Sequence, residues 1–210
     1  MIRIDRIGDI RAGWALGSAR PSVREVARWL AAVVLVGMGS AMAAADEPVR
    51  LRVLSYNIHH GRGLDDVVDL ERIARVINAV EPDLVALQEV DRGVERSGKV
   101  DQPAELARLT GTEWVFERNI PYQGGDYGNA LLSRLPIVAQ RNVHLPSHYE
   151  GEQRGCLVVD VSGPGDSGTI RVLATHLDYR PAEGERLASV EVIEQIAAEH
   201  PDQPTILMGD

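Results

Sequence analysis

Short apolar runs alternate along this chain with segments that have helical spacing. Leu51–Tyr56 alternates apolar and polar residues, which predicts a strand with one buried face. Residues 70–80 follow Asp69, a good N-cap residue, and repeat apolar side chains at the period of a helix. Further apolar runs that end in polar or turn-forming residues predict strands at Leu84–Leu87, Trp114–Glu117, Arg154–Val161, Arg171–Thr175 and Thr205–Met208.

Two more helices are expected between these strands. Residues 103–110 read as a helix that stops at Gly111, and residues 182–199 carry apolar side chains at helical spacing. The predicted apolar face of the second helix consists of Leu187, Val190, Ile193, Ile196 and Ala197.

Turn residues predict how some strands connect. Residues 123–128 look like a glycine-rich loop, and Asn129–Ser133 with Ile137–Leu145 look like a hairpin around residues 134–136. Because strand–helix–strand units alternate with hairpins, we expect mixed sheets. Two facing sheets with helices outside would bury this many apolar strands, so the predicted fold is α/β (α+β in some schemes), a four-layer αββα sandwich.

The N-terminal segment has a different character. Arg24 and Arg28 precede the apolar run Trp29–Met38, and small residues follow up to Ala45. This order predicts a Sec-type signal peptide at residues 1–45, cleaved after Ala43 or Ala45, and a secreted or periplasmic domain at 46–210. The alternative is an uncleaved membrane anchor with the domain outside the cytoplasm, although the apolar run is short for a membrane span.

Composition narrows the function. With 44% hydrophobic residues the chain can form a large core, and its 210 residues suit one domain with an appendage. The net charge is −9, and residues 46–210 are more acidic still because residues 1–45 are net basic. This acidity argues against a broad basic surface for duplex nucleic acid. The only cysteine, Cys156, lies in an apolar run and is predicted to be a buried small hydrophobe.

Five polar motifs punctuate the predicted strands in a fixed order. They are Ser55-Tyr56-Asn57, Leu87-Gln88-Glu89-Val90, residues 128–134 (Gly-Asn-Ala-Leu-Leu-Ser-Arg), Ala174-Thr175-His176-Leu177-Asp178, and residues 205–210, which end in Gly209-Asp210. Together they resemble the endonuclease/exonuclease/phosphatase family, the deoxyribonuclease I-like phosphoesterases, over about Leu51 to Asp210. The resemblance implies a two-sheet sandwich that hydrolyses phosphate esters with a divalent metal, usually Mg²⁺, with Mn²⁺ possible.

The resemblance also predicts the roles of the central residues. Glu89 is the expected metal ligand, and Asn57 would support the metal or bind a phosphate oxygen. His176 would contact the phosphoryl oxygen, and Asp210 would orient the attacking water. These types suit the chemistry, because Mg²⁺ prefers oxygen ligands and a carboxylate can orient or activate water. Each also has a plain structural interpretation, as a polar residue at a strand end or in a turn.

Four further residues are expected near the substrate. Asn129 could position it, and Arg154 could hold a phosphate through its guanidinium. Asp178 lies two residues after His176, and a local turn role is nearly as plausible. His59 stands where some family members carry a metal-binding carboxylate, so it could contact phosphate, favour a softer metal, or do neither.

The predicted function is therefore metal-dependent hydrolysis of a phosphate ester, by water attack on phosphorus. The substrate could be a nucleic acid, a phospholipid head group or a small phosphoester, and no protein partner is implied. A membrane is involved only if the N-terminal segment stays uncleaved. In the family, an aromatic and an Asn follow the Gly-Asp, and an Asp-His pair comes later. These are missing here, so we expect an incomplete, inactive or nearly inactive domain. The alternatives are a pseudoenzyme acting as a binding module and a nonfunctional truncated product.

Overall fold

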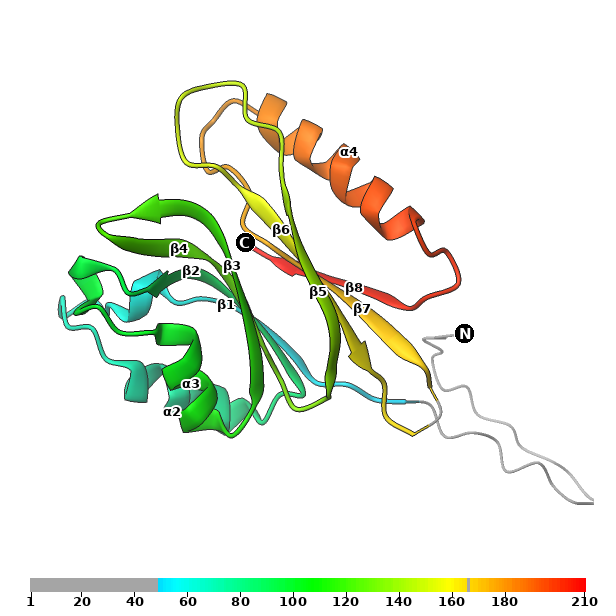
Figure 1. Ribbon diagram of the computed structural model, residues 1–210, viewed down its shortest axis with the longest axis horizontal. Coiled ribbons are helices and arrows are strands. Elements are labelled where there is room, and N and C mark those ends of the chain that lie inside the picture. Colours follow the sequence, from blue (N-terminus) through cyan, green and yellow to red (C-terminus); the bar gives the residue numbers. More distant parts are fainter. Residues whose placement is uncertain (1–48, 166) are drawn as a thin grey trace, which may run out of the picture. The chain divides into compact units, whose positions relative to one another are not determined.

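The computed structural model describes residues 49–165 and 167–210, which form two four-stranded sheets (Figure 1). The first sheet has the order β1-β2-β4-β3 and the second has the order β5-β6-β7-β8. The strands of the first sheet are β1 (Val53–Asn57), β2 (Leu84–Arg92), β3 (Glu113–Tyr122) and β4 (Gly125–Ser133). Those of the second are β5 (Ile137–His144), β6 (Gly155–Ser162), β7 (Thr169–Thr175) and β8 (Thr205–Gly209).

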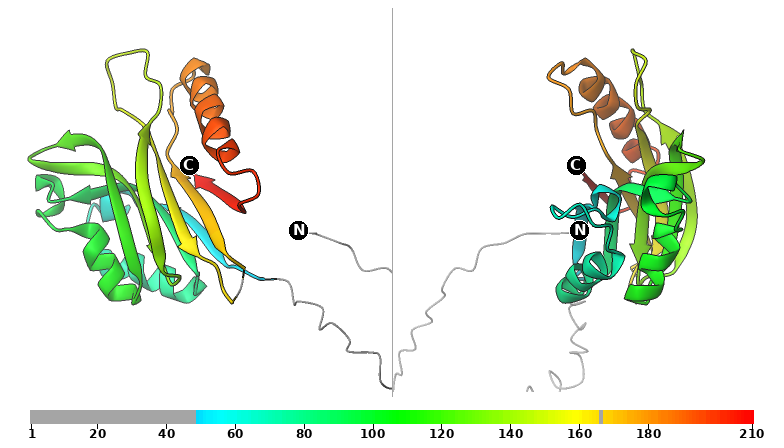
Figure 2. Two further views of the ribbon diagram at one scale, coloured as in Figure 1. Left: turned by 45° about the vertical axis from the view of Figure 1, so that its right-hand side comes forward. Right: turned by 90° about the vertical axis from the view of Figure 1, so that its left-hand side faces the viewer.

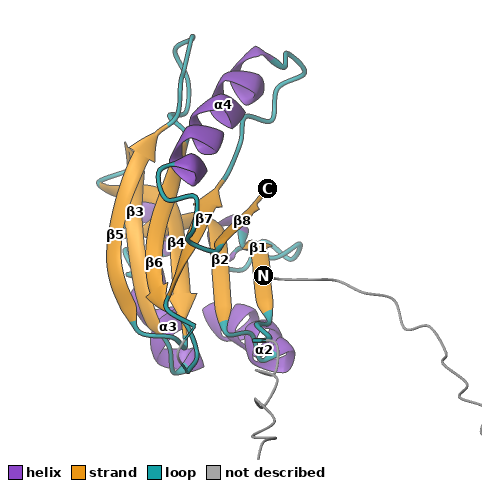
Figure 3. Cartoon of the chain, turned by 90° about the vertical axis from the view of Figure 1, so that its right-hand side faces the viewer, coloured by secondary structure: helices purple, strands orange, loops and turns teal. Residues whose placement is uncertain are grey.

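Helices cover the outer faces of both sheets. Helices α2 (Leu70–Val80) and α3 (Gln102–Thr110) lie on the first sheet, and α4 (Gly184–Ala198) lies on the second (Figures 2 and 3). Two short 3₁₀ turns, η1 (His59–Gly61) and η2 (Glu95–Ser97), follow β1 and β2. Each sheet is mixed, because β1 pairs with β2 and β7 with β8 in parallel while the other pairs are antiparallel. The predicted αββα sandwich of two mixed sheets is confirmed.

Three apolar clusters separate the four layers. Because side chains alternate along a strand, Val85 and Leu87 of β2 face α2 and α3, while Leu84 and Ala86 face the second sheet. The third cluster, which includes Cys156, lies between the second sheet and α4. Cys156 is fully buried, and burial raises the pKa of its thiol to about 12, as suits a small core residue.

Several local predictions are confirmed. Asp69 caps α2 by accepting a hydrogen bond from the backbone N–H of Arg72, and Gly111 ends α3 in the left-handed conformation. Strands β6 and β7, both predicted as strands, pair antiparallel. Of the expected apolar face of α4, Ile193 and Ile196 are buried, whereas Leu187 and Val190 are exposed.

The predicted hairpin of residues 129–133 with 137–145 is wrong. Strand β4 pairs with β2 and β3 in the first sheet, whereas β5 pairs with β6 in the second, so residues 134–136 connect the two sheets. The predicted loop at 123–128 is also shorter than expected. Only Gln123 and Gly124 form the turn, and Gly125 begins β4. Gly128 lies inside that strand, where a Cβ would come within 2.0 Å of the Glu117 carbonyl oxygen of β3.

The predicted signal peptide or membrane anchor at residues 1–45 lies outside the described residues. Within the described ranges, no helix has both the length and the apolar character needed to cross a membrane.

Candidate active site

The ends of strands from both sheets meet at one place. Asn57 is the last residue of β1, His176 follows β7, and Asp210 follows β8, which puts all three where parallel strands end. Asp210, marked C in Figure 1, is the C-terminal residue and lies at the end of β8. Gly209 allows this close approach, because a Cβ there would lie 2.6 Å from the Thr175 carbonyl oxygen.

Asn57 links three of the predicted site residues. Its Nδ2 donates to Oε1 of Glu89 at 2.8 Å and to Oδ2 of Asp210 at 2.9 Å. Its Oδ1 accepts from the backbone N–H of His59 at 3.0 Å. The amide oxygen is therefore engaged within the protein, and Asn57 holds the two carboxylates near each other. Its direct ligation of a metal stays a prediction.

Glu89 does not stand after the end of β2, as the sequence suggested, but at an irregularity inside it. The pairing of β2 with β4 shifts register between Leu87 and Val90, and Glu89 has a φ of +59°. An extra residue in one strand re-aims a side chain in this way, and such bulges are common beside active sites. The half-buried carboxylate thereby faces Asn57.

His176 is held by Arg154, which immediately precedes β6. Nη1 of Arg154 lies 3.2 Å from Nδ1 of His176, and Nε2 of His176 lies 3.9 Å from Oδ2 of Asp210. Because a guanidinium only donates, Nδ1 must accept and the ring proton sits on Nε2. Burial, and then the charge of Arg154, lowers the pKa of His176. A neutral imidazole results, with its N–H aimed at the centre of the site.

Arg154 is almost fully buried, at 5% exposure. Its Nη1 also donates to Oε1 of Glu152 at 2.5 Å, while its Nε has no hydrogen-bond partner within the described part of the chain. Burial raises the pKa of Glu152, and the neighbouring carboxylate of Glu89 raises it further. The site thus combines one buried positive charge with several carboxylates. A bound divalent cation would compensate the excess of negative charge.

Glu89 and two histidines near it offer ligands to a metal. Single ligand atoms of His59, His60 and Glu89 all lie within 4.8 Å of one another. All three residues have positive φ values, +47° for His59, +45° for His60 and +59° for Glu89. Such conformations are costly for non-glycine residues and tend to cluster at functional sites. The donor set fits a divalent cation, and metal ligation by Glu89 stays a prediction.

Gln102, at the start of α3, fixes the backbone on both sides of this cluster. Its Nε2 donates to the His60 carbonyl oxygen at 2.7 Å, and its Oε1 accepts from the N–H of Asp91 at 3.0 Å. Asp91 is fully buried and forms a bidentate pair with Arg96, at 2.9 and 2.8 Å. The sequence alone did not indicate Gln102, Asp91 and Arg96, because nothing in a single sequence distinguishes them from surface polar residues.

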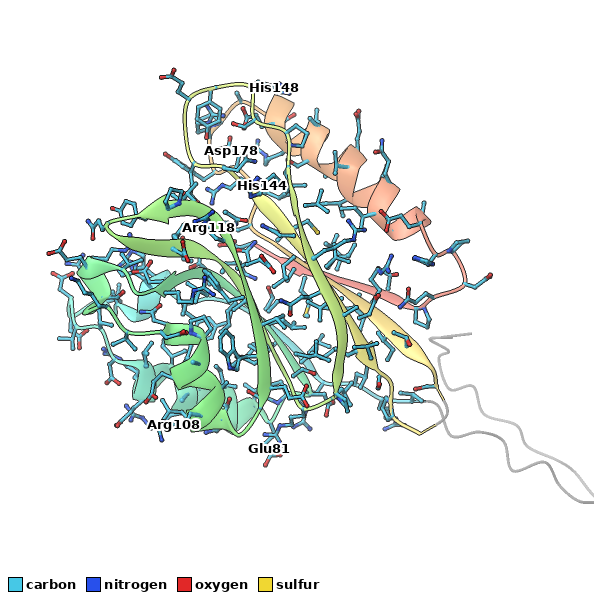
Figure 4. All side chains as sticks on the ribbon, viewed as in Figure 1. Glu81, Arg108, Arg118, His144, His148 and Asp178 are labelled. Atoms are coloured by element: carbon cyan, nitrogen blue, oxygen red, sulfur yellow. The ribbon has the colours of Figure 1, made fainter. Side chains whose placement is uncertain are left out.

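The remaining predicted residues lie at the margin of the site. Asn129 is buried inside β4, not beside a loop, and its Nδ2 donates to the Gly155 carbonyl oxygen of β6 at 3.1 Å. Asp178 accepts from the Tyr149 hydroxyl at 3.1 Å and from Nε of Arg180 at 3.0 Å, near the loop that carries His148 (Figure 4). These contacts join the sheets and order a loop, and a role for either residue in substrate binding stays a prediction.

An open groove of ≈ 490 Å³ starts at this site. It begins at Asn57 and His59 and continues over residues 61–65 to Arg72 on α2.

Comparisons with known proteins agree with the sequence motifs. A sequence model described as the Endonuclease/Exonuclease/phosphatase family matches residues 54–210. YbhP of Escherichia coli K12 is 30% identical over 168 residues, which are 76% of this chain and 65% of YbhP. An endonuclease/exonuclease/phosphatase from Beutenbergia cavernae is 33% identical with a TM-score of 0.61, over 76% of this chain and 47% of that one. This chain therefore spans less than two thirds of the length of both relatives.

A more distant solved structure shares the fold alone. The catalytic domain of human Nocturnin, solved with a bound sulfate anion, is 22% identical with a TM-score of 0.60, over 77% of this chain and 64% of that domain.

Proposed function

The chain belongs to the endonuclease/exonuclease/phosphatase family, and from this premise we propose that it is a metal-dependent hydrolase of phosphate esters that directs water at phosphorus. Membership supports phosphoester chemistry in general. The observation that carries the proposal is the meeting of Asn57, Glu89, His176 and Asp210 from both sheets. Asn57 donates to Glu89 at 2.8 Å and to Asp210 at 2.9 Å, and Nε2 of His176 lies 3.9 Å from Oδ2 of Asp210. A module that only binds would not need these groups together.

Each side chain has one part in the proposed reaction. Asp210, exposed at the strand end and held by Asn57, orients and activates the attacking water. The Nε2–H of His176 donates to a phosphoryl oxygen, because Arg154 occupies its Nδ1. Arg154 itself compensates the negative charge that the transition state spreads over the phosphoryl oxygens.

Glu89 holds the divalent metal in this proposal. The bound ion would act as a Lewis acid on a phosphoryl oxygen. The family resemblance implies Mg²⁺, with Mn²⁺ as the alternative. Asn57 keeps the Glu89 carboxylate in place, and the positive φ of Glu89 aims it at the site.

The substrate is proposed only as a class, a phosphate ester of a nucleic acid, a phospholipid head group or a small molecule. We place the reaction outside the cytoplasm, because the N-terminal segment is predicted to be a signal peptide or an anchor that exports the domain. Specificity resides in loops such as those that line the groove beside His59, and family membership does not fix it.

A substrate panel tests the proposal. A single-stranded oligonucleotide, phosphatidylcholine vesicles and a small phosphomonoester are each incubated with Mg²⁺, with Mn²⁺ or with a chelator. Should the reading frame continue past residue 210, its whole product is assayed beside the 210-residue chain, which also tests the predicted inactivity of the shorter form. We expect hydrolysis of at least one class with a metal and none with the chelator. If neither protein, folded and metal-supplemented, cleaves any of the three classes, the binding-module alternative is favoured.

Variants then test the residues. Glu89→Gln and Asp210→Asn should keep the fold and lower turnover at least about 100-fold. Glu95→Gln changes an exposed carboxylate in η2 and should leave turnover unchanged. Equal activity of Glu89→Gln and Glu95→Gln at limiting metal would remove Glu89 from the proposed site.

A further inference from the structure

The structure carries an inference about which metal this site takes. We propose that His59, His60 and Glu89 form a nitrogen-rich site that binds a transition-metal ion, Zn²⁺ more tightly than Mn²⁺, in preference to Mg²⁺. The inference rests on the proposed function only in placing a metal at Glu89. It assigns two imidazole ligands that the oxygen-ligand expectation for Mg²⁺ does not include.

The three residues are close enough to share one ion. Their ligand atoms lie within 4.8 Å of one another. Two ligand atoms about 2.1 Å from one metal at the tetrahedral angle lie about 3.4 Å apart, so a contraction of up to about 1.4 Å closes the site. His59 is exposed, and its ring contacts that of His60 edge to face, with 4.5 Å between the centroids.

A second, independent observation points to a ligand at the same place. His60 is 95% buried, being 5% exposed, and its Nδ1 has no hydrogen-bond partner among the described residues. A buried polar atom is normally satisfied, and each exception needs an explanation. His60 belongs to the cluster with Glu89 and His59, and a metal ion bound there would give its buried ring a partner.

The backbone holds the arrangement in an unfavourable conformation. His59, His60 and Glu89 account for three of the seven non-glycine residues with positive φ in the described ranges. The Gln102 side chain donates to the His60 carbonyl oxygen at 2.7 Å and so keeps that conformation in place. A neighbouring buried group that orients a ligand in this manner is a regular feature of metal sites.

The chemistry of the donors sets the preference. Imidazole nitrogen suits Zn²⁺ and its neighbours in the first transition row, whereas carboxylates and water suit Mg²⁺. Mg²⁺ also requires near-octahedral oxygen geometry and gives up its water reluctantly. For a site with two nitrogens and one carboxylate, affinity should rise from Mn²⁺ to Zn²⁺, with Mg²⁺ weakest.

Equilibrium dialysis of the full chain tests the order without any substrate. Purified chain is dialysed separately against Zn²⁺, Mn²⁺ and Mg²⁺, and bound metal is quantified by elemental analysis. One ion per chain is expected, in the order Zn²⁺, Mn²⁺, Mg²⁺. Binding of Mg²⁺ as tight as that of Mn²⁺ would overturn the inference.

A variant that gains Mg²⁺ affinity distinguishes the loss of a metal ligand from misfolding. His59→Asp replaces a nitrogen donor with a carboxylate, and aspartate tolerates the left-handed backbone at this position. It should weaken Zn²⁺ binding by a factor on the order of ten to a hundred and strengthen Mg²⁺ binding, which a misfolded protein cannot do. His200→Asn alters an exposed histidine after α4 and should change neither affinity. If His59→Asp and His200→Asn bind both ions as the parent does, His59 is not a ligand.

Failure of this inference and failure of the proposed function are distinguishable. A chain that binds Zn²⁺ through His59 but hydrolyses no phosphate ester keeps the metal site and loses the function. If the chain hydrolyses an ester with Mg²⁺ and its metal affinity does not change in His59→Asp, the proposed function stands and the proposed metal site is refuted.

Discussion

Replacing Gln102 with leucine should destabilise the fold far more than the loss of one surface residue would. Gln102 is fully buried, and both ends of its amide are engaged, at 2.7 Å with the His60 carbonyl oxygen and at 3.0 Å with the Asp91 N–H. Leucine has a similar volume but satisfies neither group. Each buried group left unpaired costs about 1–3 kcal/mol, so we expect a loss of about 2–4 kcal/mol after the apolar gain of leucine.

Urea unfolding followed by far-ultraviolet circular dichroism measures this loss. The midpoint should fall while the slope of the free energy against urea stays constant, because the surface exposed on unfolding is unchanged. Gln102→Glu places a buried carboxylate beside fully buried Asp91 and against the His60 carbonyl oxygen, so at neutral pH it should destabilise the fold at least as much as the leucine variant.

The matched control is Gln140→Leu. Gln140 is exposed on β5 and makes one bond of 3.3 Å to Glu117, so its loss should stay within about 0.5 kcal/mol. If the free energy of unfolding of Gln102→Leu lies within the same 0.5 kcal/mol of the parent, the buried amide does not stabilise the turn that contains His60.

Two further predictions concern the scaffold. The pKa of Asp160 is lowered by hydrogen bonds from Arg171, so its contribution to stability should be complete above pH 3.8 and lost as the pH falls through the lowered value. The free energies of unfolding of the parent and Asp160→Asn, measured in urea, should therefore differ at pH 7 and converge in acid. A difference that stays constant with pH would refute the pairing. Gly128→Ala should cost about 2–3 kcal/mol because its Cβ would meet a β3 carbonyl at 2.0 Å, whereas Gly184→Ala, with open space in α4, should raise the melting temperature; equal melting temperatures would contradict both assignments.

The sequence predicted the elements that local rules control. Asp69 and Gly111 are cap residues, and they bound α2 and α3 as expected. Asn57, His176 and Asp210 each follow an apolar run. Their grouping in one site was expected from the family resemblance, and the structure brings them together.

The pairing of strands could not be predicted in the same way. Residues 129–133 are buried on both faces, so their pattern does not specify which sheet they join. The short connection at Arg134–Pro136 resembles a hairpin turn, although it carries the chain from one sheet to the other. Only the packing of both sheets decides between these outcomes.

The surroundings of the metal cluster were also beyond sequence rules. The bulge at Glu89 has no glycine to mark its positive φ, and the strand was therefore expected to end before it. Gln102 lies among ordinary first-turn helix residues, and its partner atoms belong to the backbone of His60 and Asp91. Backbone partners leave no residue type in the sequence that could indicate the bond.

The hydrogen bond between Asn57 and Asp210 has a consequence for folding kinetics. It joins residues 153 positions apart, and closing a flexible loop of that length costs about 4–5 kcal/mol of chain entropy before any contact compensates it. Contacts so distant in sequence belong to slow folding topologies. During synthesis at about 5–20 residues per second, Asn57 would wait about 8–30 s for Asp210 to be made. Asn57 and Asp210 are therefore separated during most of synthesis, and the site forms only when β8 has paired with β7.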